Sequence, residues 1–170
     1  MAIPLRRGRG PKAMDGKPVH ASQVITTQLV LPNDTNQLGN LLGGTLMHWI
    51  DITAAICAQR HSGKICVTAS VDELTFHHPV KLGEIVTLQA SVNRAFTTSM
   101  EIGVLVTVSN RNEPEWRKAN TAYLSFVGLD ESGHPTRVPP VIPETDVERQ
   151  RYEQALQRRE LRLARRSSNG

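Results

Sequence analysis

One stretch of the chain, residues 45–62, limits what the rest can fold into. It reads TLMHWIDITAAICAQRHS, which has helical length and leaves almost no polar face. A helix that is apolar all round is buried on most of its sides. At 1.5 Å per residue it is about 27 Å long, so a broad sheet must curl around it. Gly63 follows at the place where a left-handed residue commonly ends a helix.

The segments on either side of this helix read as β-strands. The run before it is β-branched and is stopped by Pro32, and the runs after it alternate between apolar and polar residues. Two of the later runs are joined by a short connection, which predicts a long hairpin. The expected strands lie at residues 23–31, 65–76, 84–95, 99–110 and 117–129.

This order predicts an α+β fold of hotdog type, in which a curved antiparallel sheet of five to six strands wraps one long buried helix. A charged C-terminal helix is expected at 145–166, after a Pro-rich strap at 131–143. We divide the chain into three parts. They are a disordered basic arm at 1–20, the hotdog domain at 21–132, and the strap with the C-terminal basic helix at 133–170.

The net charge of +4 is distributed unevenly along the chain. Residues 1–20 carry +4 and residues 149–170 carry +5, so the segment between them carries −5. An acidic body with only 4% aromatic residues does not suit a nucleic-acid binder. No apolar run reaches the roughly 18 residues of a membrane helix. The two cysteines are too few for a disulfide scaffold, and no secretory signal precedes residue 20, so we expect a cytoplasmic protein.

Asp51 stands in the middle of the apolar helix, where a carboxylate must be paired, protonated or facing a cavity. Gly44 lies two turns earlier on the same face, and side chains lean toward the helix N-terminus. The N–H groups of that first turn can hold an oxygen that gains negative charge, and Gly43 and Gly44 let a carbonyl approach them. This geometry suits a hydrolase. The same spacing of Gly44 and Asp51 is also compatible with a structural role, in which the Asp51 carboxylate caps a neighbouring element or forms a salt bridge with it.

Other polar residues are weaker candidates. Asp34 and Asn36 lie in the loop PNDTNQLG, where such residues usually serve turn geometry, although Asn36 could also bind a carbonyl or orient a water. His48 has no set of partners at metal-ligand spacing, and His77 lies at a strand-to-turn corner. Both cysteines are expected to be buried and structural. The serine-hydrolase elbow and the phosphate-binding loop are absent.

Four stretches resemble a known family, the hotdog-fold acyl-CoA thioesterases of the cytosolic acyl-CoA hydrolase type. They are PNDTNQLGNLLGGTLMHWID, CVTASVDELTF, VNRAFTTSMEIGV and SFVGLDESGHPTRVPP, and the resemblance extends over about residues 22–141. The terminal RRELRL is also similar to the end of these domains. The family includes single-domain bacterial enzymes and tandem-domain animal enzymes.

The resemblance implies hydrolysis of an acyl-CoA thioester to a free acid and CoA, with no cofactor and no metal. The aspartate of the helical W-I-D motif falls on Asp51, as general base or nucleophile. The asparagine of the P-x-D-x-N-x-x-G loop falls on Asn36, which would position the thioester or a water. The glycine pair falls on Gly43 and Gly44, which with Thr45 form the carbonyl-binding helix start.

In similar enzymes, CoA runs along the strand after the helix and past the following hairpin turn. The matching residues here are Ala69, Ser70, Val71, Thr98, Ser99 and Met100. The basic C-terminal helix is either solvated or a phosphate site, and its Arg-Arg-Glu at 158–160 departs from the family pattern. Which of Arg158, Arg159 and Arg162 would meet a CoA phosphate therefore stays open.

The resemblance also implies an active site between two subunits, in dimers that assemble into a hexamer. We expect acyl-CoA and further copies of this chain as partners, a role in fatty acid metabolism, and neither nucleic acid nor membrane. The alternative is a hotdog protein that binds CoA or acyl-CoA as a regulator without turnover. Such a regulator needs a partner module, and no helix-turn-helix pattern precedes residue 20.

Overall fold

The computed structural model describes residues 14–72, 74, 78–112 and 115–168 and has the expected order of strand, helix, four strands and helix. Two 3₁₀ turns, η1 (Val19–Ser22) and η2 (Pro32–Asp34), flank the first long strand. The helices are α1 (Gly43–Ser62) and α2 (Asp146–Ser168). The strands are β1 (Lys17–Pro18), β2 (Val24–Leu29), β3 (Ile65–Val71), β4 (Ile85–Ala95), β5 (Ser99–Ser109), β6 (Arg117–Leu129) and β7 (Val141–Ile142).

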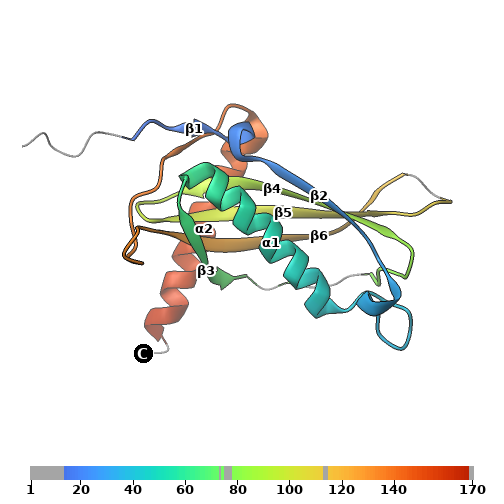
Figure 1. Ribbon diagram of the computed structural model, residues 1–170. Coiled ribbons are helices and arrows are strands. Elements are labelled where there is room, and N and C mark those ends of the chain that lie inside the picture. The colour runs from blue at the N-terminus through green and yellow to red at the C-terminus, as the bar shows by residue number, and fades with distance from the viewer. Residues whose placement is uncertain (1–13, 73, 75–77, 113–114, 169–170) are drawn as a thin grey trace, which may run out of the picture.

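Five strands form one antiparallel sheet in the order β2-β4-β5-β6-β3. The sheet curls along α1, which lies diagonally across its concave face (Figure 1). A second, two-stranded sheet joins β1 and β7 in parallel. The α+β hotdog fold predicted from the sequence is therefore confirmed. Gly63 ends α1 as expected, with a φ of 67° and its N–H bonded to the Gln59 carbonyl.

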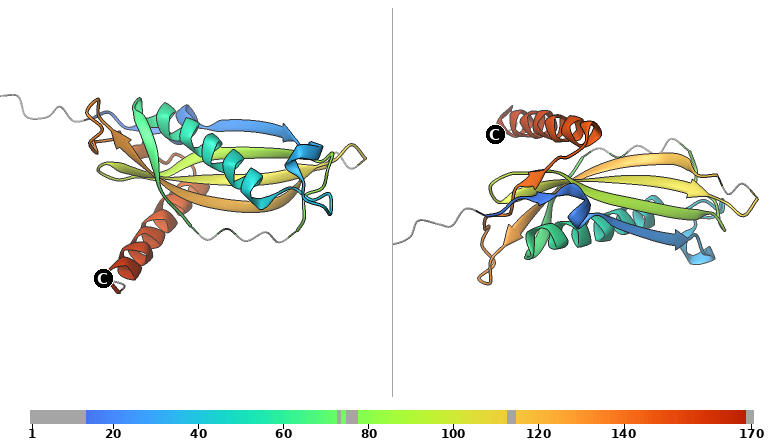
Figure 2. Two further views of the ribbon diagram at one scale, coloured as in Figure 1. Left: turned by 60° about the horizontal axis from the view of Figure 1, so that its bottom comes forward. Right: turned by 90° about the horizontal axis from the view of Figure 1, so that it is seen from above.

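The two faces of the sheet differ because side chains alternate along each strand. One face is apolar and packs on α1. Its buried residues on the three central strands are Val86, Leu88, Ala90, Val92, Met100, Ile102, Val104, Val106, Val108, Ala122, Leu124 and Phe126. The other face carries mostly polar side chains, and α2 crosses it on the side away from α1 (Figure 2). In the part of the chain that the structure describes, no helix is both long and apolar enough to cross a membrane.

The helix α1 is less enclosed by its own chain than its composition suggests. Ile52 and Ile56 remain 44% and 37% exposed, on the side that the sheet does not cover. The neighbouring edge strand β3 also exposes apolar side chains, among them Ile65 and Val67. One side of an apolar helix and the edge of the sheet beside it are thus open in the single chain.

The folded part of the chain begins earlier than the expected boundary at residue 21. Lys17 and Pro18 pair with Val141 and Ile142, and Val19 is buried in the core. The Lys17 ammonium donates to the His61 carbonyl at 2.8 Å, where a cation complements the C-terminal end of α1. The prediction of a disordered arm is therefore wrong for residues 17–20. Of the rest of that arm, residues 1–13 lie outside the described residues.

His61, in the last turn of α1, is fully buried and joins three segments. Its Nε2 lies 2.9 Å from the Pro139 carbonyl oxygen, and its Nδ1 lies 3.4 Å from Ser22 Oγ. Burial lowers the pKa of the His61 imidazole, the hydrogen bond to Pro139 opposes that shift, and the charge of Lys17 adds to it. The neutral imidazole therefore ties the N-terminal segment and the strap to the end of α1.

This packing predicts a pH-dependent stability. Because the pKa of His61 is lowered in the folded state, the unfolded chain takes up a proton first as the pH falls. The His61 contribution to the free energy of unfolding should be full above about pH 6.5 and decrease below it. His61→Gln keeps a donor for the Pro139 carbonyl but cannot titrate, so it should flatten this decrease. Urea unfolding between about pH 5 and 8 measures the effect.

The exposed His48 on the same helix provides the matched control. His48→Gln should retain the pH dependence of the wild type. An unchanged decrease in His61→Gln would show that this imidazole is not the titrating group.

Candidate active site

Asp51 lies on α1 where the helix passes β3. Its Oδ1 accepts a hydrogen bond of 2.7 Å from the Thr68 hydroxyl, and its side chain is half-buried. No cation lies within ion-pair distance of this carboxylate among the described residues. Asp51 is therefore held by a neutral partner and does not belong to a structural ion pair.

Thr68 was not singled out in the sequence, although a signal for it existed. It lies two residues after the buried Cys66 on β3, so strand alternation places both side chains toward α1. The pairing of β3 with β6 also shifts register between Thr68 and Ser70, which leaves Ala69 as an extra residue. Such bulges are frequent beside active sites, where they re-aim side chains.

The N-terminus of α1 is open. The helix begins at Gly43, two residues before the expected start, and Leu42 precedes it without a side-chain cap. The first hydrogen bond into the helix runs from the Leu46 N–H to the Leu42 carbonyl at 3.1 Å, so the N–H groups of the first residues are left without an intrahelical partner. A Cβ atom at Gly44 would meet nothing within 4 Å. A ligand oxygen can therefore approach this end of the helix.

The loop before α1 is organised by the two residues that the sequence suggested for turns. Asp34 Oδ2 accepts the Leu31 N–H at 2.9 Å, which caps η2. Asn36 Oδ1 accepts the N–H groups of Leu38 and Asn40 at 2.9 and 3.2 Å. Asn36 is exposed, and within the described part of the chain its amide nitrogen has no hydrogen-bond partner. That nitrogen can donate to a substrate.

The structure does not bring Asn36 and Asp51 into contact. Over the described ranges no hydrogen bond joins them. Asn36 belongs to the loop at the N-terminal end of α1 (Figure 1), whereas Asp51 faces β3. The two residues that the resemblance paired therefore lie in separate local networks of one chain.

A groove runs between α2 and the strands on the polar side of the sheet. One hollow of about 140 Å³ is lined by Ala69, Ser70, Phe96, Ser99, Ser125, Val127, Arg159, Arg162 and Leu163. A larger hollow of about 420 Å³ shares Ser70 and Arg162 with it and adds Val71, Asp72, Tyr123, Arg158, Leu161 and Arg165. The groove thus gathers most of the residues expected to meet CoA.

Two of the expected CoA residues stand apart from the groove walls. Met100 is fully buried in the core, so its side chain cannot contact a ligand in the groove, and only its backbone could meet CoA. Side chains alternate along β5, so Met100 points toward α1, whereas its neighbour Ser99 points toward the groove. Thr98 lies in the hairpin turn, where its carbonyl accepts the Gly128 N–H at 2.9 Å.

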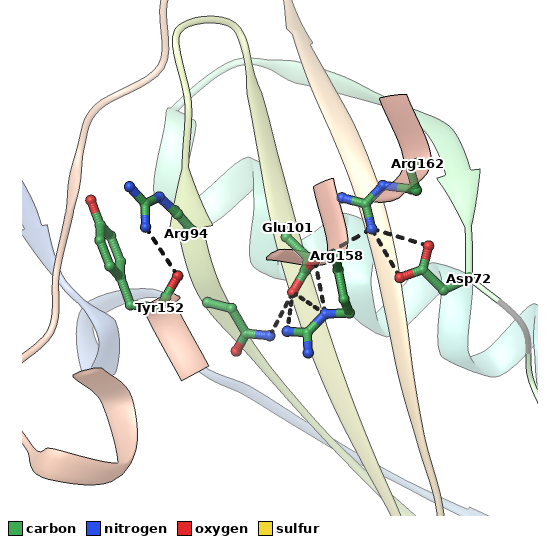
Figure 3. A network of polar contacts seen from close by, with 7 residues as sticks. Asp72, Arg94, Glu101, Tyr152, Arg158 and Arg162 are labelled. Atoms are coloured by element: carbon green, nitrogen blue, oxygen red, sulfur yellow. Dashed lines mark hydrogen bonds and ion pairs between the residues drawn. The ribbon is translucent and has the colours of Figure 1, made fainter. Parts of the chain in front are cut away.

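Arg158 and Arg162, two of the α2 arginines expected to meet CoA, have different surroundings (Figure 3). Arg158 forms a fork with Glu101, with its Nη2 2.6 Å from Oε1 and its Nε 3.1 Å from Oε2. Arg162 bonds Asp72 at 2.9 Å and lies 3.5 Å from Glu101. Burial lowers the pKa of Arg158, but the hydrogen bonds and charge of Glu101 outweigh it, and the pKa is raised. Sequence reasoning missed Glu101 and Asp72.

The thiols and imidazoles do not form a competing centre. Burial raises the pKa of the Cys57 thiol to about 12, against a smaller opposing effect of Arg60, so no thiolate nucleophile forms there. Among the described residues, no three His, Cys, Asp or Glu side chains could together hold a metal. His77 lies outside them. The available chemistry is a carboxylate, an open helix N-terminus, and a groove with cationic side chains.

Comparisons with known proteins agree with this chemistry. Residues 38–115 match the thioesterase superfamily. A Bacillus subtilis protein named uncharacterized acyl-CoA thioester hydrolase YkhA is 41% identical over 137 residues, which cover 81% of this chain and 80% of the relative. Acyl-coenzyme A thioesterase 11 of Mus musculus is 41% identical over 143 residues, or 84% of this chain. The match spans only 24% of that relative's length.

Solved structures are similar over nearly the whole chain. The acyl-CoA hydrolase of Staphylococcus aureus, in complex with butyryl coenzyme A, coenzyme A and coenzyme A disulfide, is 42% identical. Its TM-score is 0.85, with 90% of this chain and 93% of that chain covered. The same enzyme was solved as alanine variants at an asparagine, an aspartate and a threonine. An apo-hexameric acyl-CoA thioesterase is 39% identical, with a TM-score of 0.86, covering 89% of this chain and 97% of its own.

These similarities confirm the resemblance that four sequence motifs indicated. The Bacillus subtilis relative is matched over most of its length at well above 30% identity, and the Staphylococcus aureus structure has the same fold. The chain therefore belongs to the thioesterase superfamily, among its hotdog-fold acyl-CoA thioesterases.

Proposed function

We propose that this chain hydrolyses the thioester of acyl-CoA to a free carboxylic acid and CoA. The observation that carries the proposal is Asp51, a carboxylate that has no cationic partner among the described residues and lies on α1, whose glycine N-terminus is uncapped and open. Hydrolysis of an acyl carbonyl needs these two elements, a group that activates water and donors that hold the developing oxyanion. The groove beside α2 supplies cations for a phosphorylated carrier such as CoA.

The Staphylococcus aureus variants support the choice of residues. In that enzyme, the replaced asparagine, aspartate and threonine are separated by 15 and then 17 residues. Asn36, Asp51 and Thr68 have the same residue types at the same two spacings. We therefore assign Asp51 to the chemistry, Asn36 to positioning the thioester or the water, and Thr68 to holding the Asp51 carboxylate.

The proposed reaction proceeds through attack on the thioester carbon. The carbonyl oxygen accepts the N–H groups at Gly43, Gly44 and Thr45, and Asp51 takes a proton from the attacking water. The C–S bond then breaks, and CoA leaves as a thiolate that is protonated, since a thiol pKa is about 8.5. Direct attack by Asp51 would instead form an anhydride that water hydrolyses. Both routes need only water as co-reactant, so no cofactor is required.

We propose that the active unit is at least a dimer. The exposed Ile52 and Ile56 on α1 and the open edge of β3 form a surface that a second copy would cover with the same surface of its own. The separate networks of Asn36 and Asp51 support a site that takes one residue from each chain. A hexamer of such dimers is the assembly suggested by the hexameric relative. The two buried, unpaired cysteines suit a cytoplasmic setting, and the activity suits fatty acid metabolism.

A thiol-release assay tests the proposed function. The purified chain is incubated with acyl-CoA esters from acetyl to palmitoyl, and the released CoA thiol is titrated with a chromogenic disulfide. We expect turnover of at least one ester. Binding of CoA without release of thiol would instead identify a non-catalytic CoA-binding regulator, and a lack of both would reject either proposal.

Replacement of the carboxylate tests the role of Asp51. Asp51→Asn keeps the shape of the side chain and an acceptor for Thr68, but it removes the base. The value of kcat should fall at least about 100-fold, the usual range for an acid–base group. The affinity for CoA should change little. Asp146→Asn, at an exposed carboxylate near the start of α2, is the matched control and should turn over normally. Near-normal kcat in folded Asp51→Asn would refute the assignment.

Complementation between variants tests the shared site. Asn36→Ala and Asp51→Ala, each nearly inactive, are unfolded together and refolded at equal concentration. Random pairing makes about half of the dimers mixed, and each mixed dimer has one site with both changes and one with neither. About a quarter of the wild-type activity should therefore return. If both residues act within one chain, no activity returns even though mass spectrometry detects the mixed dimers.

A further inference from the structure

Glu101 is a fully buried carboxylate on the polar side of the sheet, facing α2 (Figure 3). It lies in the middle of the ion-pair network, where it forms an ion pair with the Arg158 guanidinium and a longer one, at 3.5 Å, with Arg162. A buried carboxylate persists only when charges and hydrogen bonds compensate it. Glu101 therefore fixes the position of the helix that carries its partners.

The sheet is shaped to receive this carboxylate. The register of β4 against β5 shifts between Val92 and Arg94, which makes Asn93 an extra residue in its strand. The Asn93 amide donates to Glu101 at 3.1 Å and lies directly over Gly103. A Cβ atom at Gly103 would come within 2.8 Å of the Asn93 amide nitrogen. The bulge and the glycine thus supply Glu101 with a donor from its own sheet.

A second carboxylate, Asp72 at the end of β3, completes the network. It binds Arg162 through both oxygens, at 2.9 and 3.1 Å. Arg158 and Arg162 are therefore matched by two carboxylates, and each is largely withdrawn from solvent. Arg158 also lies over the Tyr123 ring, 3.7 Å from its centroid. These two guanidinium groups are engaged in holding α2.

Arg159 differs from its two neighbours. Its Nη1 donates a hydrogen bond of 3.4 Å to the Ser99 hydroxyl, and its guanidinium lies 4.1 Å from the centroid of the Phe96 ring. Within the described part of the chain no carboxylate pairs with it. It lines the hollow of about 140 Å³ together with Ser99 and Phe96. Its positive charge is therefore available to an anionic ligand in that hollow.

We propose that Glu101 is a positioning residue of the CoA-binding groove: with Asp72 it neutralises Arg158 and Arg162 and fixes α2, so that Arg159 is the arginine that meets the CoA phosphates. This inference rests on the proposed acyl-CoA activity. It identifies which of three neighbouring arginines binds the negatively charged phosphates of CoA. A guanidinium held in a fixed orientation loses less freedom on binding a phosphate than a mobile one does.

A double-mutant cycle on Glu101 and Arg159 tests the proposal. Glu101→Gln, Arg159→Gln and the double variant are assayed with an acyl-CoA and with the matching acyl-pantetheine, which lacks the nucleotide phosphates. Arg159→Gln should raise KM for the acyl-CoA about tenfold or more and leave kcat and the pantetheine KM nearly unchanged. Glu101→Gln should raise the acyl-CoA KM several-fold in the same selective way.

The double variant separates positioning from a general structural role. If Glu101 acts through Arg159, its replacement should add little to the KM of Arg159→Gln. The proposal would be overturned if the two single-variant increases in the acyl-CoA KM multiplied in the double variant. It would also be overturned if the variants raised KM equally for acyl-CoA and acyl-pantetheine. Arg149→Gln removes an exposed arginine–carboxylate pair at the start of α2, outside the groove, and should leave both KM values unchanged.

Two further measurements keep the test decisive. If Glu101→Gln does not fold, Asp72→Asn loosens α2 at a partly exposed site. The same selective rise in KM is then expected, and no rise would count against the proposal. Calorimetric titration of CoA into each variant should show the same order of affinities without turnover. A wild-type chain that neither binds CoA nor hydrolyses acyl-CoA would instead refute the proposed function itself.

Discussion

The packing of α1 against the apolar side of the curled sheet is the interaction on which the rest of the structure depends. Ile50, Ala54 and Cys57 are fully buried there, and the length of the helix sets how far the strands must extend. This contact leaves one side of α1 uncovered. It also places Asp51 beside Thr68 of β3, the strand at the open edge of the sheet. The same packing holds the glycine N-terminus of α1 clear of the sheet, where a carbonyl can reach it.

The two faces of the sheet have different roles in the proposed reaction. The apolar face places the carboxylate and the helix start that we propose act on the thioester. The polar face seats α2 through Glu101 and Asp72, and the groove between them gathers Ser70, Ser99 and Arg159 for the carrier. Because β3 contributes to both, with Thr68 toward α1 and Ser70 in the groove, one edge strand connects chemistry to carrier binding.

Local patterns in the sequence were sufficient for most of the fold and part of the site. Alternation and the Gly63 stop located α1 and the long strands to within a few residues. The position of a carboxylate inside an apolar helix singled out Asp51, and the motif resemblance supported that choice. Contacts between distant residues could not be read in this way. The partners of Arg158 and Arg162 lie 57 and 90 residues away, on strands whose acids look like ordinary surface charges. The resemblance also could not show that the Met100 side chain is buried while its neighbour Ser99 faces the groove. Lys17 was placed in the arm because its partners lie on α1 and β7.

The most direct test of the account is a crystal structure of the Asp51→Asn variant with an uncleaved acyl-CoA. The account predicts the thioester oxygen within hydrogen-bond distance of the first N–H groups of α1, with residue 51 facing the thioester carbon. Asn36 from a second chain should lie beside it, and the nucleotide phosphates should lie at Arg159. An intact acyl-CoA whose thioester lies away from Gly43 and Gly44, or whose phosphates contact neither Arg159 nor the groove, would contradict it.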